Sequence, residues 1–185
     1  MVGLAVFGLA IIVSLPALAG LIRRERLMGA TRELARTMMA ARWRALGEGR
    51  ATGLKFTLGG ELSWTLYRDG DGDGLRSADI STGTEVALSR PVSLSHIAHG
   101  VRAGILPRSS IPRLPPQQGL LSGTDDPVKF GRSDLLSFAP AGSATPGSLY
   151  LTDGMDMTAI VVNGVTGRLR LFRYKAPENL WKEMS

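Results

Sequence analysis

The sequence predicts an α+β fold in which one long N-terminal helix packs against an antiparallel β-sheet. Residues 2–22 carry no charged side chain, and apolar residues then recur at helical spacing. After Gly53 the pattern changes to short segments that alternate apolar and polar residues, with turn-forming residues between them. These observations predict three parts: an apolar helix half (1–22), an amphipathic helix half (23–49) and a β-rich domain (50–185).

The first part of the chain is predicted to be a membrane anchor. The uncharged run VGLAVFGLAIIVSLPALAGLI occupies residues 2–22, and Arg23, Arg24 and Arg26 follow it. At about 1.5 Å per residue, a helix of this length spans the hydrocarbon core of a bilayer, which is about 30 Å thick. A cleaved signal peptide places positive charge before a shorter apolar stretch and ends at an A-x-A site. Nothing charged precedes this run and no A-x-A site cleanly ends it, so we predict a retained anchor; a signal peptide or an ordinary membrane span is the alternative.

The anchor is predicted to continue into an amphipathic helix. Apolar residues fall on one helical face, and arginine and glutamate fill much of the rest. Pro16 removes one helical hydrogen bond and predicts a kink in the apolar half. Gly47 and Gly49 predict the end of the helix. The residues of the predicted apolar face are Leu27, Leu34, Met38, Ala41 and Ala45.

The β-rich domain is predicted from segments with period-two alternation. Residues 53–58 and 61–67 flank Gly59-Gly60 and predict a hairpin. Residues 107–127 are rich in proline and lack periodicity, so they predict an exposed loop. Further strands are predicted at residues 85–89, 134–140, 147–153, 158–164 and 168–174.

Composition excludes several kinds of chemistry. The chain has no cysteine and only two histidines, which excludes thiol nucleophiles, disulfides and Cys- or His-rich metal sites. The sequence contains no G-x-S-x-G, H-E-x-x-H or P-loop motif, so we predict that the protein is not an enzyme. The net charge of +6 and the pI of about 10.3 favour anionic partners such as nucleic acid, lipid headgroups or acidic proteins.

An acidic motif runs from Asp69 to Gly74 and reads D-G-D-G-D-G. Carboxylates at alternate positions can wrap oxygen ligands around calcium, and the glycines permit tight curvature. The motif matches the first half of an EF-hand loop, but Ile80 stands at the twelfth position, where a bidentate glutamate belongs. Asp79 and Glu85 are candidate substitutes, and a solvated turn between strands is the alternative. The residues of the candidate calcium site are Asp69, Asp71, Asp73 and Asp79.

A basic motif occupies the last predicted strand, where Gly167-Arg168-Leu169-Arg170 is followed by Arg173 and Lys175. Alternate residues of a strand share a face, so Arg168 and Arg170 are expected to project together. Two adjacent guanidinium groups suit phosphate oxygens. A basic solvent face or a contact with another subunit is the alternative. The candidate DNA contacts are Arg168, Arg170, Arg173 and Lys175.

Several segments, in their order and spacing, resemble type IV pilins and type II secretion pseudopilins, specifically the H-type (GspH/FimT) branch. LAVFGLAIIVSLPALAGL (4–21) is similar to the interior of the pilin signature, with Pro16 at the family's helix-melting proline. ARWRALGEGRATGLKF (41–56) is similar to the family's helix end and first strand. Residues 135–154 and 159–171 are similar to its C-terminal sheet, so the resemblance covers nearly the whole chain.

The resemblance implies a minor pseudopilin, a structural subunit of the type II secretion pseudopilus that helps export proteins across the outer membrane. It implies a single-pass inner-membrane protein with a periplasmic domain. The N-terminal helix would contact membrane lipid before assembly and other pilins or pseudopilins afterwards, and a secreted protein or DNA is a further partner. The alternative is a FimT-like minor pilin of a type IV pilus that binds DNA for uptake through its GRxR segment (167–170).

Members of this family begin with a short basic leader, a glycine at the peptidase cut and a glutamate near the start of the mature helix. The sequence opens with Met1-Val2-Gly3 and shows none of these features. Aligning Pro16 with the family's proline puts the glutamate just upstream of Met1. We therefore expect either that these residues are encoded upstream or that the chain is a glutamate-free variant.

Overall fold

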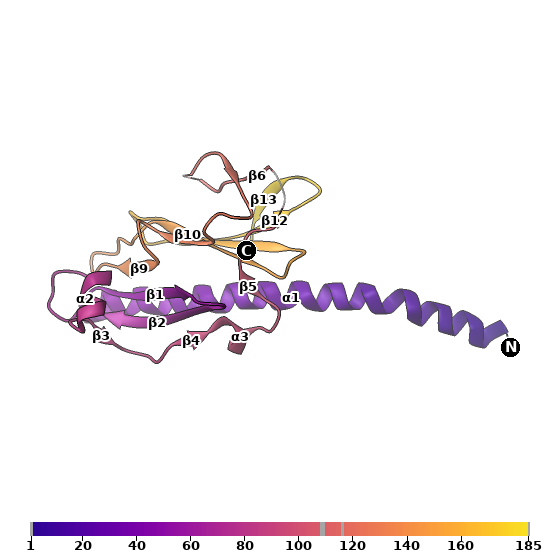
Figure 1. The fold of residues 1–185 in the computed structure, drawn as a ribbon, viewed down its shortest axis with the longest axis horizontal. Helices are drawn as coiled ribbons and strands as arrows, with labels where there is room; N and C mark the ends of the chain where they lie inside the picture. Colours follow the sequence, from indigo (N-terminus) through magenta and orange to yellow (C-terminus); the bar gives the residue numbers. More distant parts are fainter. Residues whose placement is uncertain (1, 108–109, 116, 185) are drawn as a thin grey trace.

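The computed structural model describes residues 2–107, 110–115 and 117–184, with side chains beyond residue 17. Over these residues the chain has the predicted α+β fold, in which one long helix packs against antiparallel sheets (Figure 1). Within the part described with side chains, no helix combines the length and the apolar character that crossing a membrane requires. The predicted anchor, residues 1–22, lies mostly outside that part.

Helix α1 (Val2–Glu48) forms the axis of the molecule, and its N-terminal part extends beyond the sheets (Figure 1). The kink predicted at Pro16 lies outside the residues whose side chains are described. At the other end, Gly49 has φ +65° and donates its N–H to the carbonyl oxygen of Ala45 over 3.1 Å, which ends the helix as predicted. One face of α1 is buried, with residues recurring every three or four positions. These residues are Leu27, Ala30, Thr31, Leu34, Met38, Ala41 and Ala45.

Two antiparallel sheets pack against this helix. The first has the order β3-β2-β1-β9, with β4 also paired to β2. Its strands are β1 (Thr52–Leu58), β2 (Leu62–Arg68), β3 (Val86–Ala87), β4 (Val92–Ser93) and β9 (Leu135–Phe138). The second has the order β13-β12-β11-β10-β5, with β8 also paired to β10. Its strands are β5 (Arg102–Ala103), β8 (Val128–Phe130), β10 (Gly147–Thr152), β11 (Met157–Val162), β12 (Leu169–Lys175) and β13 (Leu180–Glu183).

Three smaller elements complete the described fold. A two-stranded hairpin is formed by β6 (Ile111–Pro112) and β7 (Leu120–Leu121). Two short helices, α2 (Ser77–Thr82) and α3 (Leu94–Ile97), lie in the connections that follow β2 and β4. The predicted hairpin of β1 and β2 is present, and β9, β10, β11 and β12 match predicted strands to within two residues at each end. The strand predicted at residues 85–89 is reduced to β3, and β13 was not predicted.

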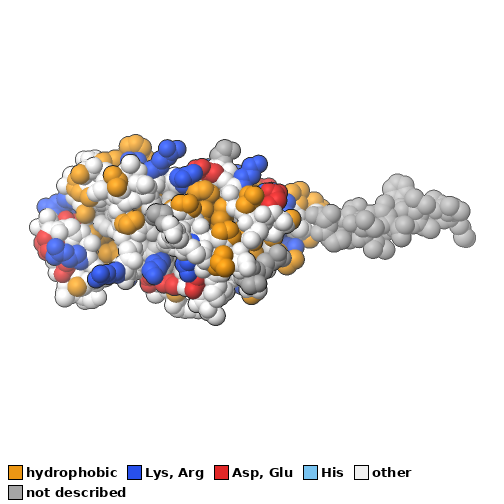
Figure 2. All heavy atoms as spheres, turned by 90° about the horizontal axis from the view of Figure 1, so that it is seen from above, with side chains coloured by type: hydrophobic (Ala, Val, Ile, Leu, Met, Phe, Trp, Pro, Cys, Tyr) orange, Lys and Arg blue, Asp and Glu red, His pale blue; other side chains and the backbone are white. Residues whose placement is uncertain are grey.

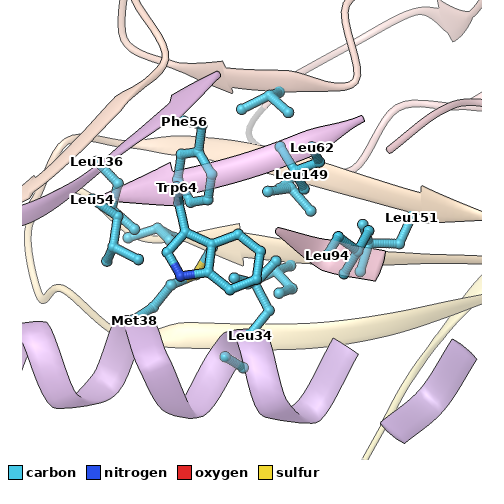
Figure 3. Packing of buried hydrophobic residues seen from close by; sticks show 14 of the residues in the cluster. Leu34, Met38, Leu54, Phe56, Leu62, Trp64, Leu94, Leu136, Leu149 and Leu151 are labelled. Atoms are coloured by element: carbon cyan, nitrogen blue, oxygen red, sulfur yellow. The ribbon is translucent and has the colours of Figure 1, made fainter. Parts of the chain in front are cut away.

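The main core lies between α1 and both sheets, where Figure 3 shows the side chains in contact. Leu34 and Met38 of α1 face Trp64 of β2, and Leu149 and Leu151 of β10 close the core from the second sheet. All five side chains are almost fully buried. Burying a large apolar side chain contributes about 1.5–3 kcal/mol, so this seam fixes the domain to the second half of the helix.

A buried pair of hydroxyl groups also ties α1 to the second sheet. The Oγ1 atoms of Thr31 and Thr158 lie 2.7 Å apart, and Thr31 Oγ1 also donates to the carbonyl oxygen of Leu27 over 2.7 Å. Because a hydroxyl has one hydrogen, Thr158 is the donor to Thr31. Both polar groups are therefore satisfied inside the core, at a position where periodicity alone predicts only apolar contact.

The segment predicted as an exposed loop, residues 107–127, differs from that prediction. Its β6–β7 hairpin lies over the outer face of the second sheet, and Ile111, Leu114 and Leu121 are buried there. Trp181 of β13 donates its indole N–H to the carbonyl oxygen of Pro112 over 2.7 Å. The outer face of the sheet carries apolar and aromatic residues that need a cover. Proline disrupts the periodicity of a segment but does not prevent its burial. The sequence pattern therefore wrongly predicted an exposed loop.

Candidate functional site

The acidic motif forms a tight loop after β2, at the end of the molecule opposite the N-terminus (Figure 1). Carboxylate oxygens of Asp69, Asp71 and Asp73 all lie within 4.8 Å of one another, so these three predicted ligands are brought together. Asp69 is 4% exposed, whereas Asp71 and Asp73 are exposed. The fourth predicted ligand, Asp79, lies on α2 and does not belong to this group.

Much of the carboxylate capacity in this loop is taken by the loop's own backbone. Asp69 accepts the N–H of Gly72 at Oδ1 over 2.7 Å and that of Gly74 at Oδ2 over 3.1 Å. Glu85, also buried, accepts the N–H of Gly70 over 3.0 Å and that of Arg76 over 3.0 Å. The carboxylates therefore fold the turn themselves, and Glu85 holds the backbone instead of replacing the missing glutamate of an EF-hand.

One glycine of the loop is required by close packing. A Cβ atom on Gly70 would stand 2.1 Å from the carbonyl oxygen of Thr84, a distance that real side chains do not adopt. Gly72 and Gly74 instead have φ +94° and +99°, the left-handed region that favours glycine. The curvature predicted from the glycines is thus confirmed, with two different physical causes.

The two exposed carboxylates of the loop differ in their proton affinity. Hydrogen bonding from the backbone N–H of Asp73 lowers the pKa of Asp71. Desolvation raises the pKa of Asp73, although the neighbouring Arg76 opposes that rise. A hydrogen bond from Arg76 to Asp73 places positive charge beside the cluster. The loop can offer carboxylate oxygens to a cation chiefly from Asp71 and Asp73, although Arg76 already engages one oxygen of Asp73.

The basic strand β12 divides its charged side chains between two faces. Arg170 lies on the outer face of β12, together with Phe172, and Arg168 directly precedes the strand. Arg170 is already engaged: its Nε and NH2 atoms donate to the two carboxylate oxygens of Glu183 over 2.9 and 2.6 Å. Its guanidinium group also lies 5.0 Å from the ring centroid of Phe172. Arg168 is exposed.

Arg173 and Lys175 lie on the opposite, helix-facing side of β12. Arg173 lies 3.4 Å from the carboxylate of Asp156, which also lies 3.5 Å from Arg24 of α1. The four candidate DNA contacts therefore do not form one patch. Arg170 and Arg173 are three positions apart in β12, so they lie on opposite faces of the strand, and Lys175 shares the face of Arg173.

The roles that three acidic residues play at these sites were not predicted. Glu183 lies on β13, a short polar strand that pattern reading does not detect. Asp156 lies in the turn between β10 and β11, so its pairing depends on tertiary structure. Glu85 was considered only as a calcium ligand. Residues 180–183 read Leu-Trp-Lys-Glu and do not alternate between apolar and polar, so no local pattern predicts β13.

Comparison of the chain with protein-family models, with curated proteins and with solved structures finds no match. The fold therefore rests on the geometry described above. A long N-terminal helix packed against antiparallel sheets is consistent with a pilin-like fold.

Proposed function

We propose that this chain is an H-type minor pseudopilin, a structural subunit of a type II secretion pseudopilus. In this proposal the apolar N-terminal part of α1 anchors the chain in the bacterial inner membrane and the domain lies in the periplasm. The chain then leaves the membrane and packs against other pseudopilins in a short filament. The observation that carries the proposal is the long helix α1, which over residues 18–48 has one face buried under the domain and another face exposed.

The free face of α1 carries exposed apolar residues near both ends of its described part. Leu18 and Trp43 are 55% and 61% exposed. They are separated by 25 positions in the sequence, or about seven turns, so they lie on the same side of the helix. That side is opposite the buried line of Leu27, Leu34 and Ala45. An exposed apolar face on a helix is typical of a surface that packs against another helix.

The free face also carries charge between its apolar ends. Arg32 and Arg36 are exposed there, and Arg36 pairs with Glu33 over 3.2 Å. A neighbouring subunit with carboxylates at the matching height would fit this mixed surface better than a uniformly apolar partner. This pattern supports packing against a different, complementary subunit, as expected of a minor component.

The alternative function is a FimT-like minor pilin that binds DNA for uptake. Arg170 projects from the outer face of β12 and the exposed Arg168 directly precedes that strand, which supports it. Glu183 binds Arg170 through both of its oxygens, however, and so competes with a phosphate for the same donors. We therefore place the secretion role first.

Site-specific photo-cross-linking in the native host tests the proposal. A photoreactive residue in place of Trp43 is expected to cross-link the chain to another pilin-like subunit in cells that assemble the filament. The matched control places the same residue at Val165, which is 85% exposed on the domain, and should give no such product. Deletion of the gene should leave secreted proteins in the periplasm.

Two results would contradict the proposal. One is recovery of the chain as a free periplasmic monomer that cross-links to no other subunit from position 43. The other is unchanged protein secretion together with loss of DNA uptake after deletion, which would favour the pilus alternative.

A further inference from the structure

A basic hollow of about 740 Å³ lies where α1 leaves the domain. Its walls come from α1, from the turn between β10 and β11, and from the end of β12 with the turn that follows. Figure 2 shows charged side chains beside hydrophobic ones at this end of the globular part, next to the emerging helix. The residues that line it include Arg23, Arg24, Met155, Asp156, Arg173 and Lys175.

The hollow has more cationic donors than its carboxylates can satisfy. Arg23, Arg24, Arg173 and Lys175 line it, against only Asp156 and Glu178. Asp156 is shared by two arginines at 3.4 and 3.5 Å, which is a loose arrangement for either. In the described part of the chain, Arg23 and Lys175 make no ion pair, and the buried Nε of Arg173 has no hydrogen-bond partner. An anion is the chemical group that this set of donors lacks.

The rim of the hollow is apolar on the side of the helix. Met155 is 64% exposed and Leu21 is 53% exposed, and both line the hollow. Arg23 directly follows Ile22, the last residue of the uncharged N-terminal run. The hollow is cationic, has an apolar rim and lies where an apolar helix emerges. This arrangement suits the depth in a membrane at which lipid phosphates meet acyl chains.

We propose that this hollow binds the headgroup phosphate of an anionic phospholipid in the leaflet that faces the domain. Arg23, Arg173 and Lys175 would donate to the phosphate oxygens, while Leu21 and Met155 contact the glycerol and upper acyl chain. A second hollow of about 230 Å³ shares Arg173 and Lys175 and adds Arg32 and Lys182, which extends the positive surface around the helix. The inference rests on the proposed membrane anchor and deepens it by naming the lipid partner.

A lipid fits this site better than a nucleic acid does. A DNA backbone presents phosphates in a row, and a binding surface for it is an open track of cations. Here the cations converge on one hollow beside an exposed methionine and leucine. Bound lipid would hold the domain against the membrane surface before the chain is extracted into a filament.

Electron paramagnetic resonance of spin-labelled lipids tests this inference with the full chain in phosphatidylcholine bilayers. The wild-type chain is expected to immobilise spin-labelled phosphatidylglycerol in preference to spin-labelled phosphatidylcholine. Each Lys or Arg near an anionic surface is worth roughly fivefold in association, so R23Q/K175Q should reduce that preference by at least about fivefold. These two residues make no ion pair in the described part of the chain, so the variant should fold normally. The matched control R90Q/R132Q removes two exposed cations elsewhere and should keep the preference.

The outcomes separate this inference from the proposed function. A chain that immobilises both lipids equally overturns the headgroup site but leaves the anchor in place, as does a preference that R23Q/K175Q retains. A chain that immobilises neither lipid has no anchor, and the proposed function fails with it. Loss of the preference on adding inorganic phosphate, but not chloride at equal ionic strength, would assign the hollow to free phosphate. Retention of duplex DNA that R23Q/K175Q abolishes would assign it to nucleic acid.

Discussion

The acidic loop after β2 and the basic hollow beside α1 are both clusters of like charge. They differ in whether the charged groups have enough partners within the fold. In the loop, Asp69 and Glu85 are buried and accept four backbone N–H groups from within the same turn. In the hollow, Arg173 has a buried Nε without a hydrogen-bond partner in the described part, and Arg24 shares its one carboxylate. Buried charge that is satisfied internally builds structure, whereas charge left without partners is available for binding.

This difference changes how the two sequence motifs are interpreted. The acidic motif matches a metal-binding pattern more closely than any other segment. Its most buried carboxylate, Asp69, already accepts the backbone hydrogen bonds that hold the turn. The cations of the hollow form no single motif, because Arg23 and Arg24 come from α1 whereas Arg173 and Lys175 come from β12.

Asp69→Ala is expected to lower the free energy of unfolding by about 2–3 kcal/mol, because two backbone N–H groups lose a charged acceptor in a partly buried turn. Denaturant unfolding of the full chain in mild detergent measures the change. Asp71→Ala removes the same charge from an exposed position and should cost far less. Equal losses for the two variants would show that the loop depends on its charge and not on its hydrogen bonds.

Calcium is the second test of the loop. If Asp71 and Asp73 bind it as the sequence predicts, a calcium concentration ten times the dissociation constant should stabilise the fold by about 1.4 kcal/mol. Thermal unfolding with and without millimolar calcium measures this, with magnesium as the control ion. The D71A/D73A variant should lose the stabilisation while keeping the turn that Asp69 holds. No shift in the wild-type chain would reduce the motif to a purely structural turn.

Asp156→Asn tests the charge of the basic hollow. Removing the carboxylate that Arg24 and Arg173 share should lower the free energy of unfolding by about 0.5 kcal/mol, since these pairs are partly exposed and screened by salt. The same change should increase the preference for phosphatidylglycerol in the spin-label experiment, because the hollow becomes more positive. Glu25→Gln, which removes an exposed charge from the free side of α1, should leave that preference unchanged. A weaker preference in Asp156→Asn would show that Asp156 positions the arginines for binding.

The elements that follow one periodicity could be predicted from the sequence. Helix α1, its end at Gly49 and the β1–β2 hairpin are set by local spacing and turn residues, so they agree with the prediction. Elements that depend on distant partners were missed. Strand β13 exists because β12 offers it an edge, and the β6–β7 hairpin is buried because the second sheet needs a cover. Neither condition can be read from a short window of sequence.

The sites show a similar division. Alternation places Arg170 on the outer face of β12, and the same rule places Arg173 and Lys175 on the other. Grouping all four as one DNA-binding set ignored that parity, so this error was avoidable from the sequence. The role of Glu183 was not accessible, because it lies on a neighbouring strand and reaches Arg170 only in the folded sheet.

Glu183→Gln gives the smallest expected effect on stability and isolates the outer face of β12. Hydrogen bonding from Arg170 lowers the pKa of Glu183 below its ordinary value of 4.5. The contribution of this pair is therefore fully present above about pH 4.5 and is lost as the pH falls through the lower pKa of the folded state. Both side chains are exposed, so the melting temperature at neutral pH should not change measurably in the variant.

The variant has a clearer effect if the chain binds DNA. Freeing Arg170 from Glu183 adds one phosphate contact, so the logarithm of the association constant should fall more steeply with the logarithm of salt concentration, by about 0.7–0.9 in slope. Arg168→Gln should make the slope shallower by a similar amount, and R90Q/R132Q should leave it unchanged. Retention of duplex DNA by the full chain across a salt series measures all three variants. If neither Glu183→Gln nor Arg168→Gln changes the slope, β12 does not bind DNA. The basic hollow then remains as the anion-binding surface of this chain.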